Sequence, residues 1–317
     1  MKVIAIEEHM LPRDIIESAN LDLGIRAGKR AAELDDVGEG RLQVMDDAGI
    51  DVQVLSALSY LVQDLQPARS VALNRALNDR MAETVSKYPD RFRALAALPM
   101  TDPTGAVDEL RRCVEELGFL GAMIHGQTNG VFLDDSSVRP ILAAAARLDV
   151  PIYLHPAPAP PAVQDVYFSG LSPEVGACLS TSGWGWHAEC GMHVLRMVAA
   201  GVFEELPDLK VIVGHMGEGL PFHLDRIEDM LSPVVKGHSK TVGETLRANV
   251  HLTTSGYNSD APLLCALAAF GVDRIMFSVD HPFGNSNKAT TYLRSAPLSP
   301  SDREKIAHGN AESLLRI

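Results

Sequence analysis

The sequence of 317 residues has few of the features that mark an extracellular or membrane-embedded protein. It contains only four cysteines, far apart and without a CxxC pair: Cys113, Cys178, Cys190 and Cys265. We therefore expect free thiols in a reducing cytoplasm. No apolar run approaches the roughly 18 residues that span a membrane. The N-terminal segment becomes acidic after four apolar residues, so we expect no signal peptide.

Positive charge is also scarce. The chain has 28 Lys and Arg against 41 Asp and Glu, which gives a net charge of −13 at pH 7. This balance argues against nucleic acid and anionic membrane surfaces as partners, because both need basic patches. At about 150 residues per domain the length suggests two domains, but a single barrel of about 250 residues with insertions fits equally well.

Short apolar runs alternate with segments of helical period along the whole chain. The runs that we expect to be strands are 3–9, 52–58, 92–99, 121–126, 151–156, 210–216, 250–255 and 275–282. The expected helices are 40–48, 68–88, 102–117, 135–148, 187–206, 220–231, 261–270 and 301–315. Most of the strands are continuously apolar, as parallel strands buried on both faces are. Eight such units predict an α/β fold of the (β/α)8 TIM-barrel type. A doubly wound open sheet is the alternative, but no glycine-rich phosphate turn follows the first strand.

One stretch interrupts this alternation. Residues 155–186 are rich in proline, glycine and serine and show little periodicity. We expect a long active-site loop after strand five, because loops of about 30 residues inside a compact domain are usually lids or binding loops. We see no reason to divide the chain and expect a single domain over residues 1–317.

Polar residues follow the apolar strands at their carboxyl ends. Strands one, five, six and eight end in Glu7 and His9, in His155, in His215 and Glu218, and in Asp280. In a barrel these ends converge around one axis. Two imidazoles and two carboxylates make a site suited to Zn²⁺, or to Mn²⁺ or Mg²⁺ if oxygen ligands dominate.

Strand geometry sharpens the first of these motifs. Successive side chains of a strand point to opposite faces, so Glu7 and His9 share the face of Val3 and Ala5. We expect this face to point into the barrel, because small side chains suit a narrow interior. The two intervening isoleucines would then pack outward against the helices.

The combined pattern resembles a known family. The matching segments are Glu7-Glu8-His9 and residues 91–99, 150–156, 214–221 and 277–283. They resemble, in order and over nearly the whole chain, the mononuclear branch of the amidohydrolase superfamily. The most similar members are the hydroxybenzoate decarboxylases of the γ-resorcylate, 2,3-dihydroxybenzoate and salicylate types. Dinuclear hydrolases of that superfamily usually begin with His-x-His and carry a bridging lysine after strand four, and neither feature is found here.

This resemblance implies one divalent ion, with Zn²⁺ preferred over Mn²⁺ or Mg²⁺. Its implied ligands are Glu7, His9, His155 and Asp280. It also implies a carboxy-lyase that removes CO₂ without oxidation from an ortho-hydroxybenzoate-type acid, protonating the ring carbon first. Asp280 is the expected acid, with a pKa raised by a dry site, and His215 and Glu218 would tune and reprotonate it.

The expected partner is a small aromatic carboxylic acid, bound in a homodimer or homotetramer. Arg226 would pair with a polar group of the substrate and, by resemblance, reach into a neighbouring subunit. We expect Trp186, His281 and Phe283 to wall the ring. His125 is the remaining candidate for substrate binding, at a position where relatives often have asparagine.

Other departures leave the substrate's identity open. Relatives commonly have Trp or Tyr in place of His281, and those that prefer resorcylate have asparagine in place of Leu231. We interpret His187 and His193, at the start of a helix, as structural.

Two other functions fit the same residues. The first is a hydrolase of a lactone, ester or amide, in which hydroxide held by the metal attacks and Asp280 is the base. The second is a non-catalytic scaffold that kept the barrel. Release of CO₂ distinguishes the decarboxylase from the hydrolase, and a metal analysis distinguishes both from the scaffold.

Overall fold

A computed structural model describes the backbone of residues 1–317 and every side chain except those of Ile25 and Arg26. Its strands are β1 (Ile4–Met10), β2 (Val52–Ala57), β3 (Phe92–Ala94), β4 (Ala96–Ala97), β5 (Ala122–His125), β6 (Ile152–His155), β7 (Val211–Val213), β8 (Val250–Thr253) and β9 (Ile275–Met276). Neighbouring strands pair in parallel, in the orders β1-β2-β3 and β4-β5-β6-β7-β8-β9. Because Leu95 alone separates β3 from β4, they form one interrupted strand, and the eight strands predicted from the sequence are all present.

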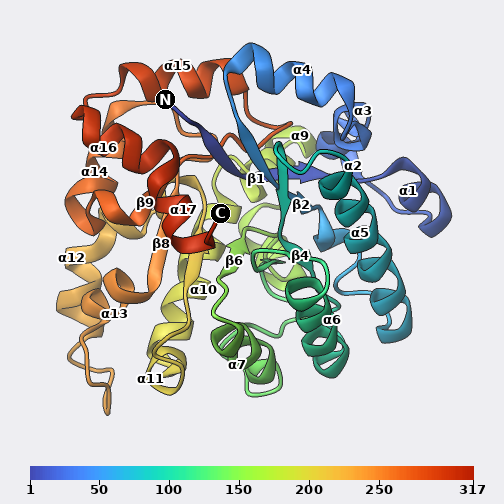
Figure 1. The fold of residues 1–317 in the computed structure, drawn as a ribbon. Helices are drawn as coiled ribbons and strands as arrows, with labels where there is room; N and C mark the ends of the chain where they lie inside the picture. Colours follow the sequence, from blue (N-terminus) through green and yellow to red (C-terminus); the bar gives the residue numbers. More distant parts are fainter.

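Backbone hydrogen bonds close the two sheets into a barrel. The Leu95 N–H donates to the Leu55 carbonyl at 2.9 Å, and the Ile6 N–H donates to the Phe277 carbonyl at 3.2 Å. The first bond joins β2 to the β3–β4 strand, and the second joins β1 to the segment after β9. The chain therefore adopts the predicted TIM barrel, with the helices outside the strands (Figure 1).

The helices cover all those predicted from the sequence, although 187–206 and 301–315 are each divided into shorter helices. They are α1 (Arg13–Ala19), α2 (Gly24–Gly28), α3 (Ala31–Asp35), α4 (Glu39–Ala48), α5 (Pro67–Lys87), α6 (Pro103–Glu115), α7 (Arg139–Leu148), α8 (Pro161–Tyr167), α9 (Pro173–Ser180), α10 (Gly185–Ala199), α11 (Val202–Glu205), α12 (Leu220–Leu231), α13 (Val242–Asn249), α14 (Asp260–Phe270), α15 (Ser286–Ser295), α16 (Pro300–Glu304) and α17 (Asn310–Leu315). Local sequence explains several ends. Asp102 caps α6 by accepting from the Gly105 N–H, and α4 stops at Gly49, whose φ is +70°. None of the described helices is both long and apolar enough to cross a bilayer.

The barrel interior shows which face of β1 points inward. Ile4 and Ile6 pack in one cluster with interior side chains of the other strands, among them Tyr153 and Ile212. Val3 belongs to the larger cluster that includes the helices. The expectation that Val3 and Ala5 face inward is therefore wrong, and large isoleucines fill the interior.

A bulge in β1 explains how Glu7 still points into the barrel. The register with β2 shifts between Ile6 and Glu8, and Glu7 has a φ of +86°. The inserted residue turns its side chain toward the inside, and alternation then resumes with His9. Glu7 and His9 therefore both point into the barrel as predicted, but because of the bulge and not because of regular alternation.

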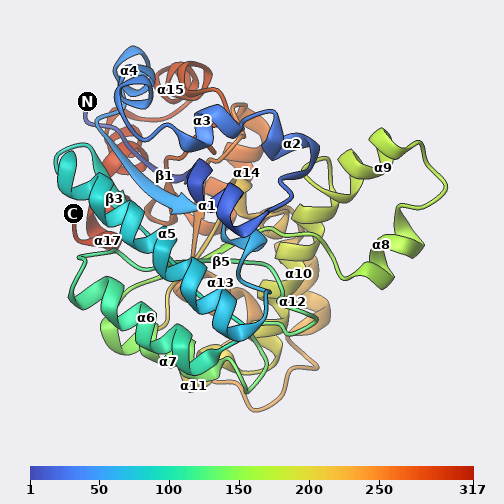
Figure 2. The same ribbon diagram turned by 90° about the vertical axis from the view of Figure 1, so that its right-hand side faces the viewer.

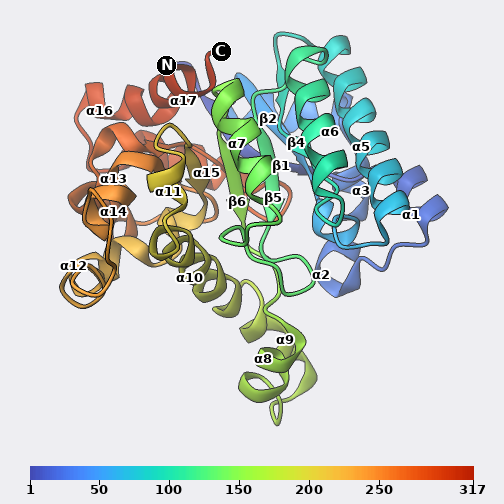
Figure 3. The ribbon, with the colours of Figure 1, turned by 90° about the horizontal axis from the view of Figure 1, so that it is seen from below.

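The segment after β6 differs from the expected irregular loop. It contains two short helices, α8 and α9, which project from the barrel in two perpendicular views (Figures 2 and 3). The two chain ends lie beside each other at the opposite end of the molecule, where Lys2 Nζ is 2.7 Å from Glu312 Oε1. The projecting helices therefore belong to the face where the strands end.

Candidate metal and acid–base site

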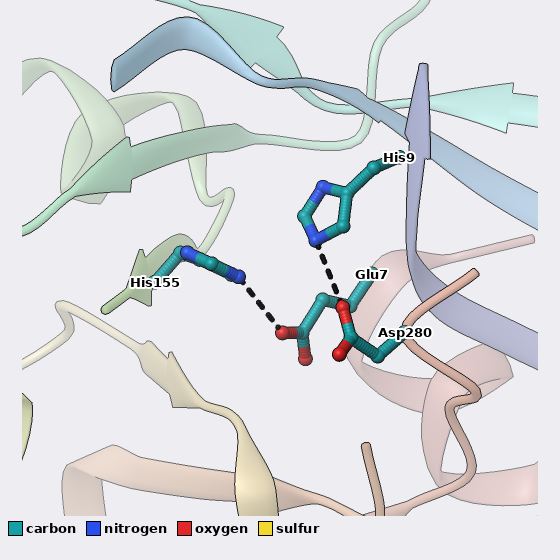
Figure 4. A group of neighbouring side chains, drawn as sticks. All are labelled: Glu7, His9, His155 and Asp280. Atoms are coloured by element: carbon teal, nitrogen blue, oxygen red, sulfur yellow. Dashed lines mark ion pairs between the residues drawn. The ribbon is translucent and has the colours of Figure 1, made fainter. Parts of the chain in front are cut away.

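Four side chains converge at the carboxyl ends of three strands. Glu7 and His9 lie in β1, His155 ends β6, and Asp280 follows β9. One ligand atom from each lies within 4.8 Å of those of the others, and all four side chains are buried. His155 Nε2 is 3.2 Å from Glu7 Oε1, and His9 Nε2 is 3.3 Å from Asp280 Oδ1 (Figure 4). The four form one compact group.

The two histidines are oriented by hydrogen bonds at their other ring nitrogens. His155 Nδ1 lies 2.7 Å from the Pro156 carbonyl oxygen, which can only accept, so Nδ1 carries the proton. His9 Nδ1 lies 3.0 Å from Ser56 Oγ on β2. Burial lowers the pKa of His9 despite the nearby negative charge of Asp280. Neutral imidazoles with Nε2 directed at a common point are what a metal ligand set requires.

The Glu7 carboxylate is held on one side and free on the other. The Tyr153 and Ser255 hydroxyls donate to Oε2, and Thr253 Oγ1 donates to it at 3.3 Å. A Cβ at Gly214 would lie 2.9 Å from that oxygen, so glycine leaves the space that the carboxylate needs. The hydroxyls fix Oε2 and leave Oε1 directed at the histidines.

The unsatisfied atoms of this group fit a cation. Glu7 Oε1 and His9 Nε2 are buried, and neither forms a hydrogen bond with any described residue. An uncompensated buried carboxylate costs several kcal/mol. Two imidazole nitrogens and two carboxylates are the ligand types of Zn²⁺ and Mn²⁺ sites. The residues therefore fit one divalent metal ion.

Glu8 points away from this group and anchors the bulge from behind. Its Oε1 accepts from the Val279 N–H at 2.9 Å, and its Oε2 accepts from Gln53 Nε2 at 3.1 Å. Burial raises its pKa to about 8, against the opposing effects of the Val279 hydrogen bond and the Arg41 charge. Arg41 Nη1 donates to the His9 carbonyl at 2.8 Å, so the backbone of the bulge is tied on both sides.

A second cluster adjoins the four-residue group. His215 Nε2 lies 3.7 Å from Glu7 Oε1 and 3.9 Å from Asp280 Oδ2. On the other side of its ring, Nδ1 lies 2.6 Å from Glu218 Oε1. Glu218 Oε2 in turn lies 2.5 Å from His187 Nδ1. Asp280, His215, Glu218 and His187 thus form one chain of polar contacts.

Charge and burial determine which of these four side chains carries the proton. Burial lowers the pKa of His215, but the negative charges of Glu218 and Glu7 outweigh it and raise that pKa well above its ordinary value. Burial raises the pKa of Asp280, but the interactions with His215 and His9 outweigh burial and leave it below its usual range. The expectation of a raised Asp280 pKa is therefore wrong. These directions favour a protonated His215 beside an ionised Asp280.

A cavity of about 640 Å³ opens onto these groups. His155, His215 and Asp280 line it, together with the rings of Trp186 and Phe283. The Phe283 ring centroid is 5.9 Å from that of His9, and helix α9 contributes to the lining farther out. The volume is typical of a small-molecule site, and the lining includes two aromatic rings.

The other predicted substrate contacts lie elsewhere. His125 is buried beside His155, with ring centroids 4.5 Å apart, and its Nδ1 is 3.0 Å from Ser59 Oγ. His125 is not among the described residues that line the 640 Å³ cavity. Arg226 lines a different cavity of about 650 Å³, together with Glu218 and His187.

His281 does not wall the cavity as expected. It is buried and is absent from the described residues that line either cavity. Burial lowers its pKa to about 3, and the nearby positive charge of Arg41 adds to that shift. A neutral, buried ring is packed behind the site.

Sequence reasoning missed several residues that shape the site. Tyr153 was part of an apolar strand, although its hydroxyl, two residues before His155, was an available signal. His187 was interpreted as structural but hydrogen-bonds Glu218, and nothing in its sequence context indicated this. His193, in contrast, accepts from the Leu133 N–H at 2.8 Å, which agrees with a structural role.

Comparisons with known proteins agree with this geometry. A profile of the family described as Amidohydrolase matches residues 17–317. The γ-resorcylate decarboxylase of Rhodococcus jostii (strain RHA1) is 37% identical over 329 residues, which cover 99% of this chain and 98% of that protein. The match includes nearly all of both chains.

Two solved structures are similar over the whole barrel. A dihydroxybenzoic acid decarboxylase from Polaromonas sp. JS666, with bound manganese and the inhibitor 2-nitroresorcinol, has a TM-score of 0.90 and 35% identity, covering 99% of this chain and 97% of that one. A 5-carboxyvanillate decarboxylase from Novosphingobium aromaticivorans DSM 12444, complexed with manganese and 4-hydroxy-3-methoxy-5-nitrobenzoic acid, has a TM-score of 0.90 and 30% identity, covering 100% and 96%. Both relatives hold manganese, so the expected preference for zinc has no support from them.

Proposed function

The chain belongs to the amidohydrolase family, and from that premise we propose that it is a metal-dependent, non-oxidative decarboxylase of an ortho-hydroxybenzoate-type acid. The observation that carries this proposal is the Asp280–His215 pair on the floor of the 640 Å³ cavity, beside the group that fits a metal ion. Such a site combines a cation-binding group with a proton donor under a space that accepts one aromatic ring.

The metal would be held by Glu7, His9, His155 and Asp280. A divalent ion bound there supplies positive charge that binds the carboxylate and phenolate oxygens of the substrate. We propose Mn²⁺ as this ion because the solved relatives hold manganese. The net charge of −13 makes a local positive charge necessary for an anionic substrate.

The reaction needs an acid at the ring carbon. Direct loss of CO₂ from a benzoate would leave an unstable aryl anion, whereas an ortho phenolate makes the carboxyl-bearing carbon basic enough to be protonated first. We propose that His215 holds the proton and passes it through Asp280, whose Oδ2 is 3.9 Å away, to that carbon. Cleavage of the C–C bond then releases CO₂ and restores the aromatic ring.

Other side chains would contact the substrate or support the site. Trp186 and Phe283 line the cavity and support a role in holding the ring. His125 would affect substrate binding only indirectly, by packing against His155. Arg226 lines the second cavity of its own subunit, so we propose that it contacts substrate only across an interface between copies of the chain.

We propose that residues 1–317 form one domain, since one barrel includes strands from both ends of the chain. The four cysteines are free, which supports the expected cytoplasmic location. We also propose that the protein forms a homodimer or homotetramer.

A substrate panel tests the proposed function. Purified protein loaded with Mn²⁺ is incubated with 2,6-dihydroxybenzoate, 2,3-dihydroxybenzoate, salicylate and benzoate, with and without a chelator. We expect CO₂ and the matching phenol from at least one ortho-hydroxy acid, none from benzoate, and loss of activity with the chelator. If no ortho-hydroxy acid releases CO₂ while an ester, lactone or amide is cleaved, the protein is a hydrolase instead.

A further inference from the structure

The inference rests on the proposed decarboxylation and concerns its proton balance. An arenecarboxylate anion and one proton give an arene and CO₂. The new C–H bond takes the proton, and the electron pair of the broken C–C bond returns to the ring. Each turnover therefore consumes one proton from the protein, which must be replaced from solvent before the next turnover.

The first route for that replacement is the cavity that the substrate would occupy. His215 and Asp280 face this 640 Å³ cavity and their side chains are 10% and 11% exposed, so a ring bound there would cover them. Glu218 and His187 line the other cavity, of about 650 Å³. The polar contacts therefore run from the first cavity to the second, whose linings share Ser182, with the reaction at one end.

His187 occupies the outer end of this chain. Its Nδ1 lies 2.5 Å from Glu218 Oε2, and its Nε2 lies 3.2 Å from the Ser182 carbonyl oxygen. Each ring nitrogen thus faces an oxygen that accepts hydrogen bonds. The side chain of His187 is 14% exposed, whereas that of Glu218 is fully buried. His187 is the member of the pair that solvent can reach.

We propose that His187 admits the proton consumed in each turnover and delivers it from the second cavity through Glu218 and His215 to Asp280. His187 gives the proton on Nδ1 to Glu218, and a proton from water restores it before the next turnover. Of the side chains that line the second cavity in the described chain, His187 is the one hydrogen-bonded to Glu218. His187 acts through Glu218 and does not touch the substrate.

Two substitutions separate proton transfer from simple positioning. In His187→Asn the amide can still donate to Glu218 but cannot carry a proton, and in His187→Ala both functions are lost. We expect both variants to lower kcat by at least about tenfold with little change in KM, and we expect added imidazole to restore His187→Ala but not His187→Asn. The control is His223→Ala, which removes another histidine of the same cavity and should keep wild-type kcat.

A second measurement does not depend on which step limits turnover. In D₂O without CO₂, the enzyme should exchange the ring hydrogen of the phenol product for deuterium, because the abstracted proton must leave to solvent. We expect this exchange to slow in both His187 variants and not in His223→Ala. Wild-type kcat or exchange in His187→Asn would overturn the proposal. Absence of CO₂ release from the wild-type protein would instead contradict the proposed function, so the two failures are distinguishable.

Discussion

At the scale of single residues, the site depends on how the two oxygens of Glu7 are divided. Oε2 is held by the hydroxyls of Tyr153, Ser255 and Thr253, and Oε1 has no hydrogen-bond partner among the described residues. This division orients the free oxygen and keeps the buried carboxylate partly satisfied before a metal binds.

Removing one hydroxyl should weaken metal binding without unfolding the barrel. Tyr153→Phe keeps the buried ring but removes one donor to Glu7, and we expect the dissociation constant for Mn²⁺ to rise by about 10- to 100-fold. Competition with a chelating dye measures it. The matched control is Tyr292→Phe, whose hydroxyl also donates to a carboxylate, that of Asp260, at 3.0 Å. Equal affinity in Tyr153→Phe and wild type would mean that Oε2 needs no such support.

Asp280 is the residue on which the chemistry depends. Asp280→Asn is nearly the same size but can neither accept a proton from His215 nor donate one to the ring. We expect the variant to fold and keep most of its metal, with kcat lowered by at least about 100-fold. CO₂ release and elemental analysis measure the two quantities. Asp273→Asn, at a surface ion pair with Lys305, should behave as wild type. Normal decarboxylation by Asp280→Asn would show that another group is the acid.

The residues that could be identified from sequence share one property. His155 and Asp280 are polar residues at the ends of apolar strands, and the barrel topology alone brings such positions together. His187 lies in helix α10, and its contact with Glu218 depends on how that helix packs against the turn before α12. The sequence around His187 contains no pattern that predicts this packing. The direction of the Asp280 pKa was likewise unpredictable, because it depends on distances to two histidines.

At the scale of secondary structure elements, the positions of the strands could be predicted from the sequence, but the bulge in β1 and the two short helices α8 and α9 could not. All eight strands follow from continuous apolar runs, but the bulge at Glu7 does not, because alternation and a one-residue insertion give the same inward side chains at residues 7 and 9. Helices α8 and α9 were missed because prolines at 160, 161 and 173 and the glycines around them mimic a loop. Prolines at the first turns of these helices in fact start them.

The end of strand β7 gives a test at this scale. A methyl group on Gly214 would lie 2.9 Å from Glu7 Oε2 and 3.1 Å from the Tyr153 hydroxyl, although the backbone φ of −70° suits any residue. We expect Gly214→Ala to push β7 from the bulge of β1, raising the Mn²⁺ dissociation constant at least about tenfold and lowering the free energy of unfolding by about 1–3 kcal/mol. Calorimetric titration and urea denaturation measure these changes.

A glycine without close neighbours is the control for that variant. In Gly309→Ala the nearest atom to the new methyl group would be the Glu304 carbonyl oxygen at 3.7 Å. The position is helical, so the free energy of unfolding should stay the same or rise by up to about 1 kcal/mol. If both alanine variants bind Mn²⁺ like wild type, the space beside Glu7 is not a constraint.

At the scale of the whole molecule, buried histidines make stability depend on pH. Burial lowers the pKa of His193 to about 4 and that of His251 to about 3, from 6.5. Below pH 6.5 the unfolded chain binds protons that the folded chain does not, so stability is full above that pH and is lost as the pH falls. The slope is up to about 1.4 kcal/mol per pH unit for each histidine.

Urea denaturation between pH 8 and pH 4 measures this loss. We expect the free energy of unfolding to decline as the pH falls below about 6.5, while the raised pKa values of Glu8 and His215 lower it toward pH 8, equally in wild type and variant. His193→Gln keeps an acceptor for the Leu133 N–H but cannot titrate, so its decline should be shallower. His223→Gln, an exposed histidine, should leave the slope as in wild type. An identical slope in His193→Gln would remove that histidine from the explanation.

The projecting α8–α9 segment argues for assembly. Val166, Tyr167 and Val175 are 76%, 72% and 53% exposed, and several exposed apolar side chains on one projecting segment are typical of an interaction surface. We expect a dimer or tetramer in sedimentation velocity, and a shift toward monomer in the double variant Val166→Ser/Tyr167→Ser. If Arg226 reaches substrate across the interface, that variant should keep its metal but lose most of its activity. Leu264→Ser, at an exposed leucine of α14, should change neither property. A fully active wild-type monomer would contradict both the assembly and the role of Arg226.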